Sequence, residues 1–427
     1  MRKTPAFSST ISNLFFKLFA RDELLDLARQ FGAVKRLRDI HPADFCLALV
    51  GSGFGDEKRS IAAARRLYAR ITGRSVEESS FFERFNDRLV AVLRLVFERA
   101  LKQAPPHLRA DLADVVAHAG IRDILGIDAS QVLLPAAAAE HLPSTDDEHG
   151  GLKVTATLSI LLQRIATIAV TDARTHDRKA LDLARDLKGN LLLFDRGYCD
   201  HALFAMIENR DGMFVTRLKA SSIPTLVAIR EGLGKAHLGA RLDAELPYRG
   251  TLDVDAAFSM PDGPPRTFRV IRLKVPKGGE NIDVWLVTNL RPEHFSAEQV
   301  GTLYRLRWSI EKLFHVLKTV GRMDQLGSAK PEVIHAFLYA TLIGMLLTQD
   351  VCLAMHAARP GCQPSTHRVA MLVTAWLPDI ARCIHDEGRL AQVLANLEKA
   401  LWTEGVNPNP GRRYMHEDYL SILPHAA

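Results

Sequence analysis

The order of apolar and polar positions divides the chain into two helical ends and a middle that contains strands. From residue 1 to about residue 115, apolar side chains recur at three- and four-residue intervals without strand-like alternation, so we expect helices there. After residue 329 the helical spacing returns. It includes the apolar run Ala336–Leu347, which is too short to span a membrane and is bounded by His335 and Asp350, so we expect a buried helix.

Short β-branched runs alternate with helical segments in the middle of the chain. Three consecutive runs bounded by turn residues predict strands at Ile121–Leu134, Lys153–Leu162 and Arg164–Thr171. The segments that follow predict a helix at Arg178–Leu187, a strand at Asn190–Phe194, a helix at Asp200–Asn209 and a strand at Met213–Leu218. Three strands followed by alternating helices and strands predict an α/β fold built on a mixed sheet.

Glycine and proline become frequent between residues 220 and 287, where they separate the runs TLDVDAAF, TFRVIRLKV and IDVWLVT. We interpret this region as a β-rich insertion, after which the main domain resumes. The predicted division is a helical N-terminal region, a first part of the core, the insertion, a second part of the core and a helical C-terminal region, at residues 1–115, 116–219, 220–287, 288–328 and 329–427.

The segment YRLRWSIEKLFHVLK, which follows the insertion, has one apolar and one polar edge when it is drawn as a single helix. Tyr304, Arg307, Glu311 and Lys318 then fall within an arc of about 60°. Lys318 stands about 10 Å along the helix axis from Glu311. This edge suits a metal-binding carboxylate beside phosphate-binding groups. The alternative is a solvated helix face with ion pairs between residues four apart.

Composition is that of a soluble protein with two or three domains: 427 residues, 47% of them hydrophobic and 24% charged. The five cysteines are scattered and lack CxxC spacing, which favours a reducing compartment and argues against a zinc site. The basic N-terminus lacks the apolar stretch and cleavage site of a secretion signal, so we expect a cytoplasmic protein associated with the nucleoid.

Positive charge is clustered within the N-terminal region. The formal net charge is +6 and the isoelectric point is about 9.1. One expected helix carries Arg59, Arg65, Arg66, Arg70 and Arg74, and three of these arginines (Arg59, Arg66 and Arg70) share a face. Such a stripe predicts contact with a phosphate backbone. The alternative is a solvated helix whose acidic partners lie elsewhere.

Three carboxylates on separate predicted elements are candidate metal ligands. Asp195 directly follows the buried run LLLF, so its side chain is expected at the carboxyl edge of the sheet, and Asp128 lies on the first predicted strand. With Glu311 they supply three hard oxygen ligands from separate elements, which suit Mg²⁺ or Mn²⁺. Two such ions could activate a water or a 3′-hydroxyl and stabilise the departing oxygen of a phosphodiester.

Other acidic residues compete for this assignment. Asp123 lies five residues before Asp128 and is the alternative first carboxylate, although its IRD flank suits a helix end or a turn. Asp146, Asp147 and Glu148 lie in STDDEHGG between two predicted strands, and we interpret them as part of a solvated turn.

Two motifs resemble those of a known family. DRGY at residues 195–198, followed by Y-x2-R-x3-E-x6-K from Tyr304 to Lys318, is similar to the DDE transposases of bacterial insertion sequences, in particular the insertion-sequence-four family with its YREK signature. Trp308 and Ile310 also resemble the RW-IE context of that signature. The resemblance covers about residues 120 to 325 and implies a ribonuclease H-like core interrupted by a β insertion.

The resemblance also implies roles for individual residues. Asp128, Asp195 and Glu311 would be the catalytic, metal-binding triad, with Mg²⁺, for which Mn²⁺ substitutes, as two ions in each active site. Contacts to phosphates of the transposon end would be made by Tyr304, Arg307 and Lys318. The family often has glycine after the first aspartate, whereas this chain has Ala129.

The implied activity is that of a DNA transposase, which binds terminal inverted repeats, exposes a 3′-hydroxyl and joins it to target DNA. Two ends must be brought together, so a homodimer is expected in the DNA complex, with residues 331–404 as candidate dimer surface and the basic N-terminal helices as candidate end-binding region. Trp285 either supports a flipped base, as an aromatic residue of the insertion can in related transposases, or is a core residue of its strand. A stand-alone metal-dependent nuclease and a catalytically inactive DNA-binding regulator are the alternative functions.

Overall fold

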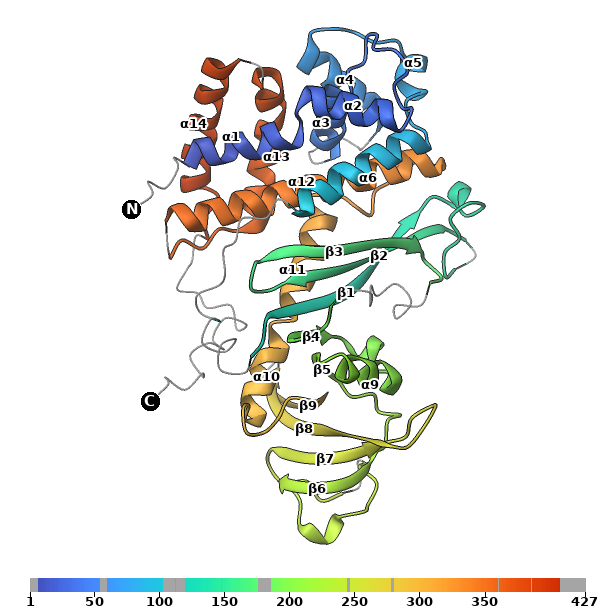
Figure 1. Ribbon diagram of the computed structural model, residues 1–427, viewed down its shortest axis with the longest axis vertical. Coiled ribbons are helices and arrows are strands. Elements are labelled where there is room, and N and C mark those ends of the chain that lie inside the picture. The colour runs from blue at the N-terminus through green and yellow to red at the C-terminus, as the bar shows by residue number, and fades with distance from the viewer. Residues whose placement is uncertain are drawn as a thin grey trace.

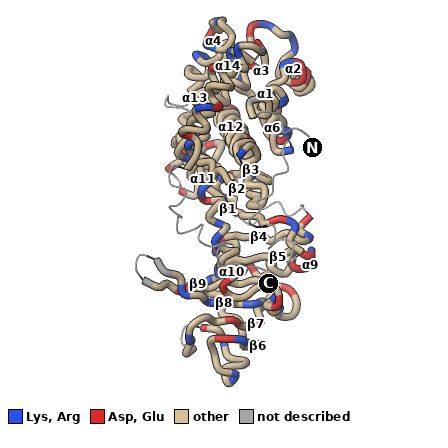
Figure 2. The backbone as a smooth tube through the Cα atoms, turned by 90° about the vertical axis from the view of Figure 1, so that its left-hand side faces the viewer, with Lys and Arg blue, Asp and Glu red and all other residues tan. Residues whose placement is uncertain are grey.

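The computed structural model describes residues 7–53, 60–102, 112, 120–146, 148–175, 186–243, 246–277, 280–359, 361–384 and 386–407. Helices lie at one end of the molecule and a large sheet follows, whose strands β6 (Thr225–Glu231) and β7 (Leu252–Phe258) lie at the other end (Figures 1 and 2). Residues 176–185 lie outside the described part of the chain, and they include most of the helix predicted at Arg178–Leu187.

A nine-stranded mixed sheet forms the centre, in the order β3-β2-β1-β4-β5-β9-β8-β7-β6. β1, β4 and β5 are parallel to one another, and the remaining neighbours are antiparallel. The strands are β1 (Asp123–Leu134), β2 (Gly150–Ser159), β3 (Arg164–Asp172), β4 (Asn190–Phe194), β5 (Met213–Arg217), β6 (Thr225–Glu231), β7 (Leu252–Phe258), β8 (Arg266–Lys277) and β9 (Glu280–Thr288).

The predicted mixed α/β sheet is confirmed, and the four strand segments from residue 121 to 194 appear within a few residues of their predicted bounds. The runs between residues 251 and 288 form β7, β8 and β9. β9 pairs with β5, so these strands extend the central sheet rather than forming a separate one. The edge strand β6 was not predicted from the sequence.

Helices at both ends of the chain were predicted, and the structure confirms them. Before the sheet come α1 (Phe7–Leu18), α2 (Arg21–Gln30), α3 (Pro42–Gly53), α4 (Ile61–Thr72), α5 (Glu78–Phe82) and α6 (Asp87–Lys102). α9 (His201–Asn209) lies between β4 and β5. After β9 come α10 (Ala297–Arg305), α11 (Trp308–Thr319), α12 (Pro331–Ala358), α13 (Thr366–Cys383) and α14 (Glu387–Thr403).

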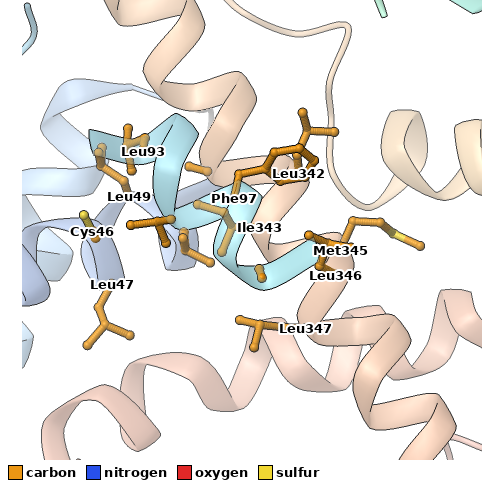
Figure 3. Packing of buried hydrophobic residues seen from close by; sticks show 14 of the residues in the cluster. Cys46, Leu47, Leu49, Leu93, Phe97, Leu342, Ile343, Met345, Leu346 and Leu347 are labelled. Atoms are coloured by element: carbon orange, nitrogen blue, oxygen red, sulfur yellow. The ribbon is translucent and has the colours of Figure 1, made fainter. Parts of the chain in front are cut away.

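One hydrophobic core joins the two helical ends. Its buried side chains come from α1 to α6, from α11 to α14 and from one face of β1 to β3. Figure 3 shows its centre, where Cys46 and Leu49 of α3 and Phe97 of α6 lie beside Ile343 and Leu346 of α12. α12 has the length and hydropathy of a membrane span, but 89% of its most apolar window is buried inside the protein, which fits the predicted buried helix.

A buried ion pair ties the sheet to this helical core. Arg164, the first residue of β3, pairs with Asp350 of α12 at 2.7 Å, and their side chains are 2% and 6% exposed. The guanidinium of Arg164 also donates hydrogen bonds to the carbonyl oxygens of Ala100 and Leu101 at the end of α6. One arginine thereby satisfies the carbonyls at a helix end and joins α6, α12 and β3.

The two faces of the sheet are covered by different helices. α9 packs against a face that includes Leu192 and Phe194 of β4, whereas Leu191 and Leu193 face α10 with Val300 and Leu303. Successive side chains of a strand point to opposite faces. The side chain of the residue that follows a buried strand therefore points to a face of the sheet that can be deduced from this alternation.

Candidate active site

Two of the predicted carboxylates lie on neighbouring parallel strands at the same edge of the sheet. Ile127 of β1 is paired in register with Phe194 of β4, so Asp128 and Asp195 are the next residues on the two strands. Alternation along each strand directs both side chains to the face that α10 and α11 cover. Asp195 directly precedes the 3₁₀ turn Arg196–Tyr198, and its backbone carbonyl oxygen accepts a hydrogen bond from the N–H of Tyr198 at 3.0 Å.

The helix that carries Glu311 packs closely on β1 at Gly126. A Cβ atom added there would lie 3.6 Å from Cβ of Ile310, an ordinary contact distance, so alanine would fit, whereas a longer side chain would meet Ile310. Gly126 lies on the same face as Asp128, two residues further on, and Ile310 directly precedes Glu311. The packing of Ile310 on Gly126 thus places Glu311 on the same side of the sheet as Asp128.

The predicted continuous helix from Tyr304 to Lys318 is wrong in one respect. α10 ends at Arg305 and α11 begins at Trp308. Between them the backbone N–H groups of Leu306 and Arg307 bond to carbonyls three residues earlier, not four. The chain winds more tightly at this turn, so the arc of about 60° calculated for an uninterrupted α-helix does not apply.

Arg307 and Glu311 meet across this break. Nη2 of Arg307 donates to Oε1 of Glu311 at 2.5 Å, and the side chains are 15% and 28% exposed. The Arg307 guanidinium also lies 5.7 Å from the ring centroid of Tyr304. Among the described residues, neither Oη of Tyr304 nor Nε of Arg307 has a hydrogen-bond partner of normal geometry. Two buried donors therefore remain available to a ligand beside the carboxylates.

The surroundings of Asp128 change the ionisation of its carboxyl. Burial raises the pKa of Asp128 to about 6, and the charges of Glu311 and Asp195 act in the same direction. The N–H of Ala129, which donates to Oδ1 of Asp128 at 2.8 Å, and the charge of Arg307 oppose this shift. Burial also raises the pKa of Tyr304 well above its ordinary value, so its hydroxyl keeps its proton.

The donor set has the chemistry of a site for a hard divalent cation. Asp128, Asp195 and Glu311 offer only carboxylate oxygens, and their mutual repulsion would be relieved by a cation such as Mg²⁺ or Mn²⁺. Within the described ranges, no three His, Cys, Asp or Glu side chains are gathered closely enough to hold a metal ion. Glu311 is instead paired with Arg307.

A further cation was missed in the sequence. Phe194 of β4 is in register with Thr216 of β5, so Arg217 lies beside Asp195 on the neighbouring strand and on the same face. The Thr216 hydroxyl donates to the carbonyl oxygen of Asp195 at 3.1 Å. Strand register, which the sequence does not show, is what identifies Arg217.

A cavity of about 170 Å³ opens next to this group. Apolar side chains of β8 and β9 form one wall, and the other walls are formed by Arg217, Tyr304, Arg305, Arg307 and Trp308. Trp308 is 43% exposed. An apolar floor with a cationic rim can accept a ligand that is both flat and anionic.

Comparison with known proteins places the chain in a family. The family model described as transposase DDE domain matches residues 120–347, more than half of the chain.

The chain belongs to this family of DDE transposases.

Individual relatives agree with this membership. The chain is 41% identical over 68 residues to a putative transposase, InsL, of insertion sequence element IS186A from Escherichia coli K12, which covers 16% of this chain and 18% of the relative. It is 24% identical over 383 residues to the transposase of IS231F from Bacillus thuringiensis subsp. israelensis, covering 78% of this chain and 77% of the relative. The resemblance to insertion-sequence transposases stated from the residues is thus confirmed.

Asp123 lies far from the other carboxylates of the transposase. It is the first residue of β1, not part of a helix end or turn, and it pairs with Asn190, the first residue of β4. Its carboxylate accepts hydrogen bonds from the Ser159 hydroxyl and the Ile124 N–H. Five residues of strand, about 16 Å, separate it from Asp128. The geometry therefore favours Asp128 as the first carboxylate.

The acidic segment after β1 has the features of the solvated turn that was predicted. Oδ1 of Asp146 accepts from the backbone N–H groups of Glu148 and His149. Asp146 and Glu148 are exposed, and Asp147 lies outside the described residues.

Trp285 lies on the sheet face opposite Tyr304. Its neighbours Val284 and Leu286 line the cavity, whereas Trp285 packs on the α9 side and contacts the ring of Tyr248, with ring centroids 5.1 Å apart. The Arg272 guanidinium lies 6.0 Å from the Trp285 ring centroid. Trp285 is therefore part of the packing of the insertion, as the core interpretation of its strand predicts.

The remaining predicted DNA contacts lie away from the carboxylates. Lys318 is half-buried in the last turn of α11. Arg66 and Arg70 are exposed on α4. Arg59, the third member of their predicted face, lies outside the described residues. Arg65 instead bonds to Glu78 and to the carbonyl oxygen of Val76.

Proposed function

We propose that this transposase binds the terminal inverted repeats of an insertion sequence, cuts a phosphodiester at the element's end and joins the freed 3′-end to target DNA. The observation that supports this function is the placement of Asp128, Asp195 and Glu311 on one side of the sheet, beside the buried Oη of Tyr304 and Nε of Arg307, which lack hydrogen-bond partners among the described residues. In this proposal the carboxylates bind cations and the Tyr304 and Arg307 donors bind a phosphate. This agrees with the membership of the chain in the DDE transposases.

The strands that carry the site support a ribonuclease H-like core. β1 to β3 form an antiparallel meander, β4 and β5 follow in parallel beside β1, and α10 and α11 cover the site face. In this proposal residues 116–219 and 288–328 are the core and residues 220–287 are an insertion. Residues 1–115 bind DNA and residues 329–427 complete the helical part.

Asp128, Asp195 and Glu311 would hold Mg²⁺, or Mn²⁺ in its place, and the bound ions supply activation of a water or a 3′-hydroxyl and stabilisation of the leaving oxygen. The chain's own groups position the DNA. Arg307 can grip a phosphate with its fork once it releases Glu311, and Tyr304 can donate its hydroxyl proton in a hydrogen bond to a phosphate oxygen.

Two further cations extend this contact. Arg217 supplies positive charge at the carboxyl end of β5, beside Asp195. Lys318 supplies a point charge two turns beyond Glu311, about 10 Å along α11. Together they would place the transposon end along α11 and across the edge of the sheet.

Recognition of the ends is assigned to the N-terminal helices, with Arg66 and Arg70 contacting the backbone of double-stranded DNA. Transposition joins two ends, so we propose a homodimer in the DNA complex. The predicted dimer surface at residues 331–404 must be narrowed, because α12 is buried within the protomer. α13 and α14 remain, with Met371 of α13 56% exposed.

The Asp195→Ala variant tests this function. Cleavage of a terminal-repeat duplex in Mg²⁺ should be abolished while binding of that duplex remains, because the carboxylate holds metal rather than DNA. The matched control is Asp211→Ala, which removes an exposed carboxylate. Cleavage by Asp195→Ala at the rate of the control would exclude Asp195 from the site. A wild-type protein that cuts but never joins a 3′-end to a target plasmid would be a nuclease.

A further inference from the structure

The loop between α2 and α3 carries a second concentration of positive charge. Lys35, Arg36 and Arg38 are exposed and lie within four residues, and Asp39 is the one acidic residue between α2 and α3. Many other arginines of the N-terminal helices pair with carboxylates, as Arg94 does with Glu98. Within the described residues, no hydrogen bond or ion pair engages the side chains of these three loop cations.

Both ends of the loop are fixed. At its start, Nη1 of Arg88 donates to the carbonyl oxygen of Gly32 at 3.0 Å. At its end, the Tyr68 hydroxyl donates to the carbonyl oxygen of Asp39 at 2.8 Å and accepts from the N–H of His41 at 3.2 Å. Two buried apolar residues, Val34 and Ile40, insert into the core on either side of the cations.

This anchoring has an energetic consequence. A backbone that is already ordered loses little conformational entropy when its side chains bind a ligand, so more of the electrostatic attraction is retained as affinity. Leu37, between Arg36 and Arg38, is 43% exposed, which shows that the loop directs this whole segment outward.

The spacing of the cations fits a continuous polyanion. Residues 35 to 38 can span at most about 10 Å, and the chain bends at Lys35 and Arg36. Duplex DNA carries one charge per about 1.7 Å of helix axis, so the same length presents about six phosphates. A single acidic side chain would engage one of the cations and leave the others unsatisfied.

The loop is separate from the basic face of α4. Tyr68, which holds the loop, is 1% exposed on the inner side of that helix. Arg66 and Arg70 are each two residues from Tyr68, which places them about 200° around the helix. They project outward, so the two sets of cations lie on different sides of α4.

We propose that Lys35, Arg36 and Arg38 form a second surface for the DNA backbone, independent of Arg66 and Arg70. This inference rests on the proposed function, because DNA is the polyanion that the transposase must hold. The surface contacts phosphates and not base edges, so it strengthens binding to repeat and to unrelated duplexes alike.

The test is a triple variant, K35Q/R36Q/R38Q, of the full chain. Binding of a terminal-repeat duplex and of an unrelated duplex of equal length is measured by fluorescence anisotropy over a range of salt concentrations. The slope of log K against log salt should fall by about 0.9 for each phosphate that the variant no longer neutralises, hence by about 2 to 3 for both duplexes. Affinity at low salt should fall at least about tenfold.

Two further variants test whether the decrease in slope belongs to the loop cations. K235Q/R241Q/R249Q removes three exposed cations from the insertion and should leave the slope unchanged. R66Q/R70Q should lower the slope separately, and the combined five-residue variant should show the sum of the two decreases because the surfaces are independent. An unfolding midpoint equal to that of the wild type would show that each variant is folded.

An unchanged slope in the folded triple variant would overturn the inference, as would an equal decrease in the insertion control. If the variant instead fails to bind vesicles rich in phosphatidylglycerol while DNA binding is intact, the loop is a membrane contact and the inference is wrong. If wild type binds both duplexes equally and the triple variant lowers both slopes, this surface stands and the proposed recognition of repeats fails.

Discussion

Arg307 holds the carboxylate of Glu311, with Nη2 of the arginine 2.5 Å from Oε1 of the glutamate. In the proposed function, the first group binds a phosphate of DNA and the second binds metal. While the pair persists, the guanidinium of Arg307 is not available to a phosphate and the carboxylate of Glu311 is not available to a metal ion. A phosphate that draws Arg307 away frees Glu311, which links binding of the DNA end to completion of the metal site.

This pair leads to a prediction about metal affinity. In Arg307→Gln, Glu311 has no cationic partner at this position, so Mn²⁺ should bind more tightly than to wild type when no DNA is present, while cleavage of a terminal-repeat duplex falls severely. Titration calorimetry measures the first effect and a cleavage assay the second. Arg305→Gln, a neighbouring arginine outside the pair, is the control. Equal Mn²⁺ affinities for Arg307→Gln and wild type would show that the pair does not restrain Glu311.

The two candidate first carboxylates should behave differently. Asp128→Asn should abolish cleavage, because Asp128 lies beside Asp195 at the carboxyl edge of the sheet. Asp123→Asn should retain most of it, because Asp123 is the first residue of the same strand, five residues before Asp128, and accepts a hydrogen bond from Ser159. The measurement is the rate of strand cleavage for both variants with matched thermal stability. The reverse order of activities would show that Asp123, not Asp128, is the first carboxylate of the site.

The raised pKa of Asp128 predicts a pH dependence of stability. A carboxyl whose pKa is about 6 in the folded protein and about 3.9 in the unfolded chain binds its proton more tightly when folded. Its favourable contribution is therefore present below the unfolded pKa and is lost as the pH rises through about 6.

Asp128→Asn removes this titration. In metal-free buffer the variant should unfold at a higher temperature than wild type at about pH 7.5, and the difference should shrink toward about pH 4. Scanning calorimetry across this range measures it. A difference that does not vary with pH would mean that Asp128 has an ordinary pKa. Added Mg²⁺ should stabilise wild type and leave Asp128→Asn nearly unaffected.

The Arg164–Asp350 pair predicts a large effect on stability. Asp350→Ala leaves a guanidinium that is 2% exposed without its counter-charge and should lower the free energy of unfolding by about 3–5 kcal/mol. Replacing both residues by apolar ones, Arg164→Met with Asp350→Leu, should recover much of this decrease. Urea unfolding gives both values. If the double variant is less stable than Asp350→Ala, the carbonyl contacts of Arg164 at α6 carry the stability.

Local sequence features placed the candidate carboxylates on the correct secondary-structure elements. Asp195 could be placed at the end of β4 because a fully buried run ends one residue before it. Leu306 and Arg307 show where local reasoning fails. Both have helical backbone angles, so the apolar period continues across them, and only the change in hydrogen-bond partner interrupts the helix.

Features that depend on strand pairing could not be predicted. Arg217 is an ordinary cation in the sequence, and its place beside Asp195 comes from the register of β4 with β5, whose strands are separated by a helix. β6 is an edge strand with exposed alternate residues such as Val227, so it lacks the buried run that identifies β4. The sequence also predicts the N- and C-terminal helices as separate regions, and it does not show that they pack into one core.

That shared core constrains how the protein can be made. The rings of Phe7 and Trp402 lie 5.2 Å apart although they are near opposite ends of the chain. Contacts of such sequence separation are closed late, because the chain entropy of a very long loop must be given up first. On the ribosome, the N-terminal helices would emerge with their apolar faces uncovered and wait for α12 to α14. A product shortened by an early stop codon would thus be a substrate for proteases rather than a competitor at the DNA.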